Sequence, residues 1–232
     1  NNSVINNTIF SNGLRGIFVN TDNTTVHGNN VYGNSNYGIY IYKVAGHVNV
    51  TNNYVYNGLN RGIESQESQN ISVTNNYVFN NSLHGFFLYK TNNSLFRNNT
   101  LTDNFKSSYG GNVELSVFSF NIFEDNKIIG GSDFGLRTYI NVNNNIIRNN
   151  LVYDQHSSGI SLYQIDGGEI SINNEVFHNT IVIADDGRWP LNMKDGSSAN
   201  TVYNNIFLTQ HSSYGSIALE GISGIDINYN IL

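Results

Sequence analysis

One short motif recurs along the whole chain and constrains its fold more than any other feature. An apolar residue followed three positions later by asparagine can be aligned in ten consecutive copies, at spacings of 22–29 residues. Within each copy the apolar residues alternate with period two, as they do in β-strands. A repeat of this length predicts one coil of a stacked structure per copy. The ten pairs are Val4/Asn7, Val26/Asn29, Val50/Asn53, Val73/Asn76, Phe96/Asn99, Phe123/Asn126, Ile147/Asn150, Val176/Asn179, Val202/Asn205 and Ile227/Asn230.

This repeat length predicts an all-β fold, a right-handed parallel β-helix (solenoid) of about ten rungs. A unit of 22–29 residues accommodates three short strands and three turns, which close one rung. Successive rungs would stack about 4.8 Å apart. We expect a single domain over residues 1–232. A rung is already under way at Asn1, and the chain ends just after the tenth copy. We therefore expect a segment of a longer chain, with flanking domains or end-to-end stacking partners.

The repeated asparagine has a physical role in such a stack. If every copy places it at the same corner, each side-chain amide can donate a hydrogen bond to one neighbouring rung and accept one from the other. Asparagine also tolerates the left-handed backbone conformation of tight turns. We therefore expect the ten asparagines to form one continuous ladder.

Composition supports strands and turns and excludes several classes of function. The chain has 44 asparagines, 22 glycines and no cysteine, and 12% of its residues are charged. Such a chain, rich in Val, Ile, Tyr, Phe and Thr, favours strands separated by turns. A net charge of −6 argues against nucleic acid as a partner, because phosphate recognition requires a basic face. No run of 18 apolar residues is present, so we expect no membrane span. Disulfides and thiolate metal sites are excluded.

A glycine nine residues after the ladder asparagine marks one strand in six rungs. Side chains one and three positions after it should point inward, and those two and four positions after it should point outward. In the fifth rung an insertion shifts this register, and we align Val113 and Leu115 with the inward positions. A second insertion, around Trp189 and Pro190, falls in the eighth rung. The six glycines are Gly16, Gly38, Gly62, Gly85, Gly135 and Gly159.

The outward positions of these strands form a long aromatic stripe, which we expect to be exposed. Tyr and Phe rings stack on sugar rings, and tyrosine hydroxyls bond to sugar hydroxyls. The alternative is that the rings are only favourable neighbours across rungs of a sheet. The candidate polysaccharide-binding residues in the stripe are Tyr40, Tyr42, Phe87, Tyr89, Tyr139 and Tyr163.

Three charged residues interrupt the stripe and are candidate catalytic residues. Glu64 and Glu114 lie two rungs apart, about 9.6 Å on a 4.8 Å rise. This is near the upper end of the roughly 6.5–9.5 Å that separates the carboxylates of inverting glycosidases. Arg137, one rung beyond Glu114, could neutralise a uronate carboxylate in a lyase or an epimerase. The alternative is that Glu114 and Arg137 form an ordinary surface ion pair.

Further polar residues allow both binding and structural interpretations. Arg61 and His84 precede the repeated glycine and are candidate contacts for an anionic sugar, or else solvent-facing turn residues. The remaining histidines lack the spacing of a metal site, so we expect no metal and no other cofactor. Two acidic pairs, Asp185 with Asp186 and Glu124 with Asp125, are weak candidates for a calcium site. They are weak because adjacent side chains on a strand point in opposite directions.

The repeat resembles a known group of proteins. Units such as SVTNNYVFNNSLHGFFLYKTNN resemble the parallel β-helix repeats of the carbohydrate-binding and sugar-hydrolase domain group, in the pectin-lyase-like superfamily. The resemblance covers essentially the whole chain. That superfamily includes lyases, hydrolases, epimerases, phage tailspikes and non-catalytic surface modules. The resemblance implies a secreted, periplasmic or cell-surface protein with polysaccharide as its partner.

The stretch VYDQHSSG at residues 152–159 has a second, local likeness. It is similar to the tyrosine-Asp-Pro-His-acid stretch of mannuronan C5-epimerases, with Gln155 in place of proline and Ser157 in place of the acid. The likeness implies a site at Asp154 and His156. The repeat instead places both residues in a turn, where other copies have small or turn-forming residues.

Two classes of function remain open. The first is a polysaccharide-binding, structural or adhesive surface module, and the second is a lyase, hydrolase or C5-epimerase acting on a polyuronate or similar glycan. Catalytic β-helices usually need long loops to form a cleft that excludes water. Six of the nine spacings stay within 22–25 residues, which favours the module. Insertions at 104–112 and 184–198 could still form the walls of a groove around Glu114 and Arg137.

Overall fold

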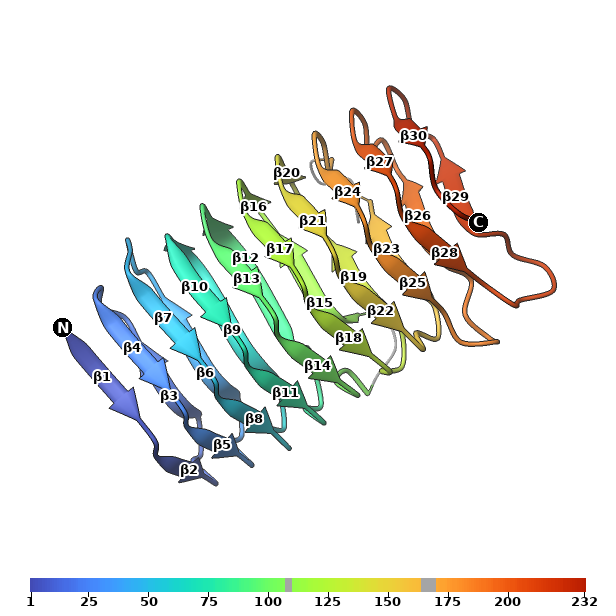
Figure 1. Ribbon diagram of the computed structural model, residues 1–232. Coiled ribbons are helices and arrows are strands. Elements are labelled where there is room, and N and C mark those ends of the chain that lie inside the picture. Colours follow the sequence, from blue (N-terminus) through green and yellow to red (C-terminus); the bar gives the residue numbers. More distant parts are fainter. Residues whose placement is uncertain (107–109, 164–169) are drawn as a thin grey trace.

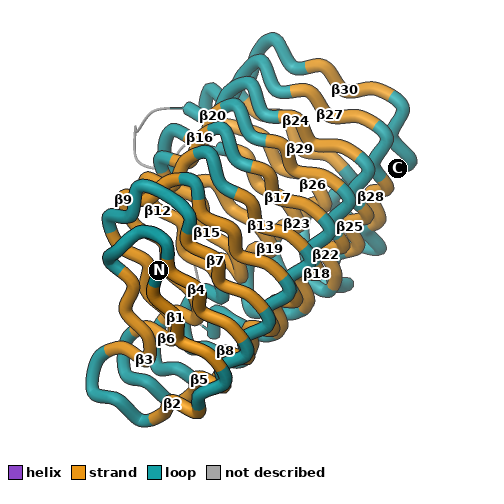
Figure 2. Tube along the Cα trace, turned by 60° about the vertical axis from the view of Figure 1, so that its left-hand side comes forward, coloured by secondary structure: helices purple, strands orange, loops and turns teal. Residues whose placement is uncertain are grey.

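The chain folds into a stack of coils that builds three parallel β-sheets (Figure 1). The computed structural model describes residues 1–106, 110–163 and 170–232. All of the regular elements within these ranges are strands. Over the same ranges, no helix has the length and apolar character needed to cross a membrane. The expected all-β parallel solenoid is confirmed, and Figure 2 shows the two chain ends at opposite ends of the stack.

Sheets A and B take one short strand from each coil, in chain order. Sheet A has ten strands: β1 (Asn2–Ile5), β4 (Thr24–His27), β7 (Val48–Thr51), β10 (Ile71–Thr74), β13 (Leu95–Arg97), β17 (Ile122–Glu124), β21 (Ile146–Arg148), β24 (Glu175–Phe177), β27 (Thr201–Tyr203) and β30 (Asp226–Asn228). Sheet B has nine strands: β2 (Thr8–Phe10), β5 (Asn30–Tyr32), β8 (Tyr54–Tyr56), β11 (Tyr77–Phe79), β14 (Thr100–Thr102), β18 (Lys127–Ile129), β22 (Leu151–Tyr153), β25 (Thr180–Val182) and β28 (Ile206–Leu208).

Sheet C contains the strands that follow the repeated glycine. Its main path is β3 (Arg15–Val19), β6 (Tyr37–Tyr42), β9 (Arg61–Gln69), β12 (Phe86–Asn92), β15 (Gly111–Ser116), β19 (Phe134–Thr138), β23 (Ser158–Leu162), β26 (Trp189–Lys194) and β29 (Ile217–Glu220). Two short strands, β16 (Phe118–Ser119) and β20 (Val142–Asn143), pair beside this path. The alignment of the fifth rung is confirmed, because Val113 and Leu115 lie opposite the inward residues Phe86 and Leu88.

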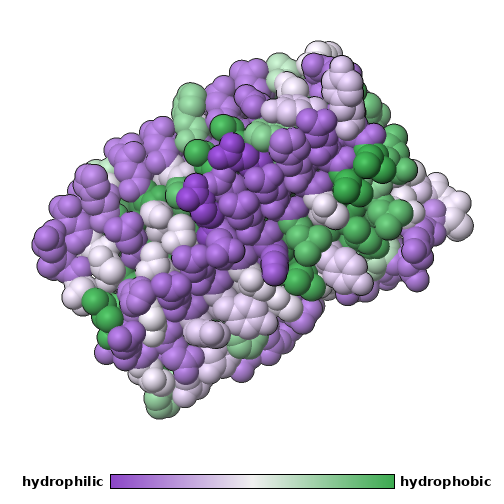
Figure 3. Space-filling view, in the orientation of Figure 1, coloured by the Kyte–Doolittle hydropathy of each residue, from purple (hydrophilic) through white to green (hydrophobic). Residues whose placement is uncertain are grey.

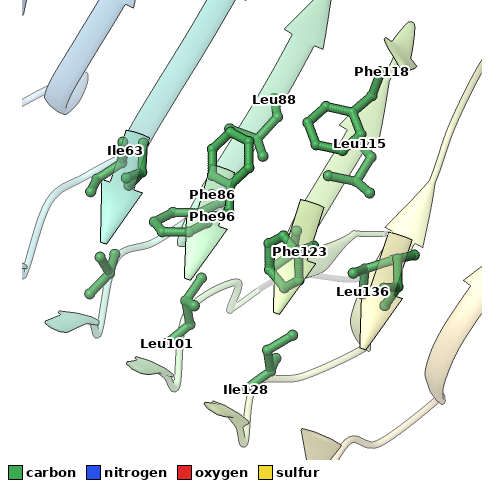
Figure 4. Packing of buried hydrophobic residues seen from close by; sticks show 14 of the residues in the cluster. Ile63, Phe86, Leu88, Phe96, Leu101, Leu115, Phe118, Phe123, Ile128 and Leu136 are labelled. Carbon is green, nitrogen blue, oxygen red and sulfur yellow. The ribbon is translucent and has the colours of Figure 1, made fainter. Parts of the chain in front are cut away.

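Inward side chains of the three sheets form one continuous apolar core. Ile63, Phe86 and Val113 of sheet C are completely buried in successive rungs. Figure 4 shows Phe96 and Phe123 of sheet A packed beside them, with ring centres 6.1 Å apart. Full burial of one such side chain contributes about 1.5–3 kcal/mol. The core therefore extends along the axis instead of forming a globule.

The repeated glycine is required by close approach to the next coil. A Cβ on Gly38 would lie 2.3 Å from the Val55 side chain and 2.6 Å from the backbone oxygen of Gly62. Any larger residue would push neighbouring rungs apart. The glycine thus lets sheet C begin tightly against sheet B.

The predicted asparagine ladder is confirmed along its whole length. At each of the nine steps, the Nδ2 of one asparagine donates to the Oδ1 of the next at 2.9–3.1 Å. Many of these amides also donate to a carbonyl in the preceding rung, as Asn99 does to the oxygen of Val73 at 2.9 Å. Two shorter columns, which sequence reasoning missed, lie five residues to either side, for example Asn12 with Asn34 and Asn121 with Asn145.

The face seen in Figure 3 is largely hydrophilic, with hydrophobic side chains in separate patches. Only 12% of the residues are charged, so Asn, Ser and Thr provide most of this polarity. Such a face offers many uncharged hydrogen-bonding groups.

Candidate functional site

The outward face of sheet C gathers the predicted site residues in the expected columns. Tyr40 lies opposite Glu64, and Glu64 opposite Phe87. Glu114 follows Phe87 and lies opposite Arg137 in the next rung. The sequence register therefore placed these residues on the correct strands and on one face.

Many side chains on this face are less exposed than the expected long exposed stripe requires. Tyr40, Glu64 and Arg137 are only 6%, 2% and 6% exposed. Glu114 and Tyr163 are buried as well. Tyr42, Phe87, Tyr89 and Tyr139, in contrast, are half-buried. The expected exposure is wrong for much of the stripe, because neighbouring rungs are so close that long side chains cover one another.

Two aromatic rings of the stripe, Tyr40 and Phe87, have their faces occupied by protein, and Tyr42 stacks on Tyr40 at 5.5 Å. Tyr40 stacks against Phe18 and Tyr37 at centre distances of 5.5 and 4.7 Å. The guanidinium carbon of Arg61 lies 3.6 Å from the centre of the Phe87 ring. Sugar stacking requires a free ring face. At these two positions the alternative interpretation, rings as neighbours within the sheet, describes the geometry better.

Arg61 and Glu64 form a compact polar unit beside Tyr40. Arg61 Nη1 lies 2.6 Å from Glu64 Oε2. Burial raises the pKa of the Glu64 carboxyl, and the Arg61 guanidinium opposes this shift. Burial together with the Glu64 carboxylate raises the pKa of Tyr40 to about 12. The Tyr40 hydroxyl donates to Gln66 Oε1 at 2.7 Å, so it stays protonated.

Glu114, Arg137 and His84 form a second, fully buried polar cluster. Arg137 donates to Glu114 Oε2 from Nε at 3.1 Å and also from Nη2. His84 Nδ1 lies 2.8 Å from the Gly111 carbonyl oxygen, so this nitrogen is the donor, while Nε2 lies 3.8 Å from Glu114 Oε2. Burial lowers the pKa of His84 to about 4, which keeps the imidazole neutral at physiological pH. The aromatic ring of Phe105 packs on the imidazole at 4.9 Å.

These clusters bring together the three candidate catalytic residues without opening them to solvent. Glu64 and Glu114 each accept from an arginine, and the half-buried Phe87 lies between them in the same column. A glycosidase needs both carboxylates at the sugar, one of them able to donate a proton. The geometry here is that of two arginine–carboxylate pairs. The catalytic role of Glu64, Glu114 and Arg137 stays a prediction.

A hollow of about 420 Å³ lies at the C-terminal end of the same face. Strands β19, β23, β26 and β29 contribute to its lining, which includes Tyr163. Burial raises the pKa of Tyr163, and Arg137 opposes this shift. Sequence reasoning missed the other lining residues, although the eighth-rung insertion with its single tryptophan was a signal. Members of the lining include Phe134, Ser158, Arg188, Trp189, Asn192 and Lys194.

Asp154 and His156 lie in a turn, as the repeat predicts. Asp154 adopts the left-handed conformation, with φ of 59°, directly after β22. His156 Nδ1 lies 2.7 Å from Asp186 Oδ1 in the next rung, and both side chains are exposed. The ion-pair partner of His156 is therefore Asp186 of the next rung.

Two of the four acidic residues considered for calcium, Glu124 and Asp186, are engaged with basic side chains. Glu124 accepts from Arg97 on one side and from Arg148 Nε at 2.7 Å on the other. Burial opposes the shift, but hydrogen bonds from Arg148 and Arg97 lower the pKa of Glu124. Within residues 1–106, 110–163 and 170–232, no three His, Cys, Asp or Glu side chains converge as metal ligands.

Two protein-family models match the chain. A model described as "Right handed beta helix region" matches residues 1–118, and one described as "Periplasmic copper-binding protein (NosD)" matches residues 60–216. The chain belongs to both families. Membership of the right-handed β-helix family agrees with the handedness expected from sequence. The copper named in the NosD description finds no fitting set of ligands among the described residues, and the chain has no cysteine and one methionine.

Solved structures share this β-helix fold at low sequence identity. The mannuronan C-5 epimerase AlgE4 A-module of Azotobacter vinelandii has a TM-score of 0.60 and 16% identity, covering 97% of this chain and 57% of that one. The periplasmic alginate epimerase AlgG has a TM-score of 0.65 and 14% identity, with coverages of 90% and 62%. An alginate lyase from Paenibacillus sp. str. FPU-7 has a TM-score of 0.59 and 11% identity, with coverages of 99% and 92%.

These likenesses concern the fold alone. This β-helix chain spans little more than half the length of the two epimerase structures, but nearly all of the lyase structure. No curated protein matches the sequence significantly.

Proposed function

We propose that the chain is a β-helix module outside the cytoplasm, secreted, periplasmic or at the cell surface, that binds polysaccharide along the outward face of sheet C. The periplasmic description of the NosD family and the polysaccharide-modifying enzymes that share the fold support the setting and the ligand class. Binding needs an accessible row of side chains, whereas catalysis needs accessible reacting groups as well.

One observation supports the proposal above the others: half-buried tyrosines recur at alternate rungs, each beside a cation. Tyr42, Tyr89 and Tyr139 occupy one outward column, with one rung between each and the next. Two rungs span about 9.6 Å, close to the length of two pyranose residues in an extended chain. The column therefore repeats with the period of a disaccharide.

Each of these tyrosines has a cation near its ring, farther from the ring centre than Arg61 is from that of Phe87. Lys43 Nζ lies 4.9 Å from the Tyr42 ring centre, and Lys90 Nζ lies 5.1 Å from that of Tyr89. The guanidinium carbon of Arg137 lies 5.9 Å from the ring centre of Tyr139. A ring and a neighbouring cation together can contact both the apolar face and the polar groups of a sugar.

The experiment is a binding titration with polyuronate and neutral oligosaccharides, by calorimetry. Tyr42→Ala and Tyr89→Ala should each weaken binding about 3–10-fold, since an aromatic contact contributes about 0.5–1.5 kcal/mol. Tyr153→Ala is the matched control, because Tyr153 is 48% exposed on sheet B. Equal affinities for all three variants, or no binding to any glycan, would reject the proposal.

The second candidate is an enzyme acting on such a glycan, a lyase, hydrolase or C5-epimerase. The contiguous buried cluster of His84, Glu114 and Arg137, continued by Tyr163, favours it, because a neutral histidine, a cation and a tyrosine are groups that proton abstraction beside a carboxylate uses. Incubation with polyuronates tests it by the appearance of unsaturated or epimerised products. Loss of product in Glu114→Gln, with binding retained, would support the enzyme over the module.

A further inference from the structure

The hollow at the C-terminal end of sheet C differs from the rest of the face because an insertion forms part of its wall. It encloses about 420 Å³. The eighth-rung segment before β26 contributes Arg188, and β26 itself contributes Trp189, Asn192 and Lys194. We propose that this hollow is a subsite for a single uronate residue, with its carboxylate on Arg188 and Lys194 and its ring against Trp189. The inference rests on the proposed function and names the chemical class of ligand at one position.

Arg188 is the first reason for an anionic sugar. Arg61, Arg97, Arg137 and Arg148 all pair with a glutamate. Arg188 is exposed, and no carboxylate within the described ranges lies within ion-pair distance of it. A guanidinium without an acidic partner can bind a carboxylate through two parallel hydrogen bonds.

Lys194 places a second cation in the same hollow. Its Nζ lies 5.2 Å from the ring centre of Tyr163 and 3.6 Å from Asp195 Oδ2. Glu220 also lines the hollow and would repel a carboxylate from its own side. The charges therefore orient the sugar, with the carboxylate toward Arg188 and Lys194 and the hydroxyls toward Glu220 and Asn192.

Trp189 supplies the apolar surface that a sugar ring needs. The indole is half-buried and meets Tyr214 edge to face, with ring centres 4.9 Å apart and an angle of 67°. Tyr40 is instead stacked within a column of nearly parallel rings. Among the described residues no cation lies over the Trp189 ring either. The packing with Tyr214 fixes the indole without the parallel stacking that occupies the Tyr40 ring.

The hollow also contains a polar group that the protein leaves unpaired. Ser158 lines it and is fully buried, and its hydroxyl has no hydrogen-bond partner in the part of the chain that the structure describes. Buried hydroxyls are nearly always paired. A sugar hydroxyl both donates and accepts, and it reaches Ser158 once this side chain turns toward the hollow, because the hydroxyl oxygen is closed to solvent in this conformation.

The test compares tetramannuronate with neutral mannotetraose on the intact chain, by calorimetric titration. Arg188→Ala should weaken tetramannuronate binding about tenfold or more and leave mannotetraose binding unchanged, because only the uronate has a carboxylate. Trp189→Ala should weaken the binding of both. Lys127→Ala removes an exposed cation on sheet B and should change neither. Unfolding curves of each variant establish that it is folded.

The outcomes separate this inference from the proposed function. If Arg188→Ala binds tetramannuronate as wild type does, or if wild type binds both probes equally, the uronate subsite is wrong. If Tyr42→Ala weakens binding while Arg188→Ala and Trp189→Ala do not, the sheet C face binds glycan and only the subsite fails. If wild type binds neither these probes nor any other glycan, the proposed function fails with it.

Discussion

A ladder asparagine such as Asn99 stabilises three successive rungs at once. Its amide donates to Val73 and to Asn126, and its oxygen accepts from the backbone and the side chain of Asn76. Asn99→Ala would leave several buried groups without partners, each costing about 1–3 kcal/mol. We expect the free energy of unfolding to fall by at least about 2 kcal/mol in chemical denaturation.

The control for this prediction is Asn49→Ala, in the exposed part of β7. It should change the free energy of unfolding by less than about 0.5 kcal/mol. Similar curves for the two variants would show that the ladder contributes little to stability.

His84 should make stability depend on pH in a defined window. Burial lowers its pKa to about 4, whereas unfolded histidine titrates near 6.5. Between these values the unfolded chain binds a proton that the folded chain does not. The free energy of unfolding should therefore fall as the pH decreases from about 6.5 to about 4, by roughly 3 kcal/mol over the window.

Denaturation at pH 7.5, 5.5 and 4.5 measures this effect as the difference between wild type and His84→Gln. The variant should lose less stability on acidification than wild type does. His47→Asn, at an exposed turn, should behave as wild type. Parallel pH profiles of wild type and His84→Gln would mean that the pKa of His84 is the same in the folded and the unfolded chain.

Residue positions were predictable from sequence where the repeat determines them. The ladder from Asn7 to Asn230 and the outward register of Glu64 and Arg137 follow from counting. The columns through Asn34 and Asn145 were equally countable, at five residues on either side of the ladder, and were overlooked. Burial of His84 was not predictable, because it depends on Phe105, whose position is set by an insertion that breaks the repeat.

At the scale of strands, β15 and β19 are joined by a buried ion pair. Arg137 and Glu114 are each less than a tenth exposed, so neither charge can be solvated alone. Arg137→Met would leave Glu114 buried without its partner, and we expect a loss of about 3–5 kcal/mol in the free energy of unfolding. The double variant Arg137→Met with Glu114→Gln should recover most of this loss, because no unpaired charge remains. Chemical denaturation of the three proteins gives the coupling energy.

The exposed pair of Lys43 and Glu67 is the comparison for this prediction. The two charges lie 3.6 Å apart, and more than half of the Lys43 side chain is exposed. Lys43→Met should cost no more than about 1 kcal/mol. If Arg137→Met cost as little, sheet C would not depend on its buried ion pair.

The hollow beside β26 is a feature that could not be predicted from the sequence. Trp189 was visible as the single tryptophan in an insertion, but insertions have no repeat register. Its position opposite Ser158 depends on how the inserted segment returns to sheet C. The strand order, in contrast, follows from the repeat, since consecutive coils can pair only with their neighbours.

At the scale of the whole molecule, a solenoid distributes its stability along one axis. Each rung contacts only its neighbours, so stability is approximately a sum of rung and interface contributions. Loss of Asn99 should therefore raise hydrogen exchange in its own rung and in the two adjoining ones more than near Asn205. Uniformly faster exchange along the chain would show that the coils unfold as one unit.

The net charge of −6 should slow the approach of a polyuronate to the proposed uronate subsite. A polyuronate approaches a molecule of its own sign, and only the last step brings it to Arg188. Salt screens the long-range repulsion, with a Debye length of about 10 Å at 0.1 M. We expect the association rate of tetramannuronate to rise about 2–5-fold between 10 and 150 mM salt, while that of mannotetraose stays constant. Stopped-flow measurements check this, and a rate that falls with salt would mean that the cations of the hollow attract the ligand already at long range.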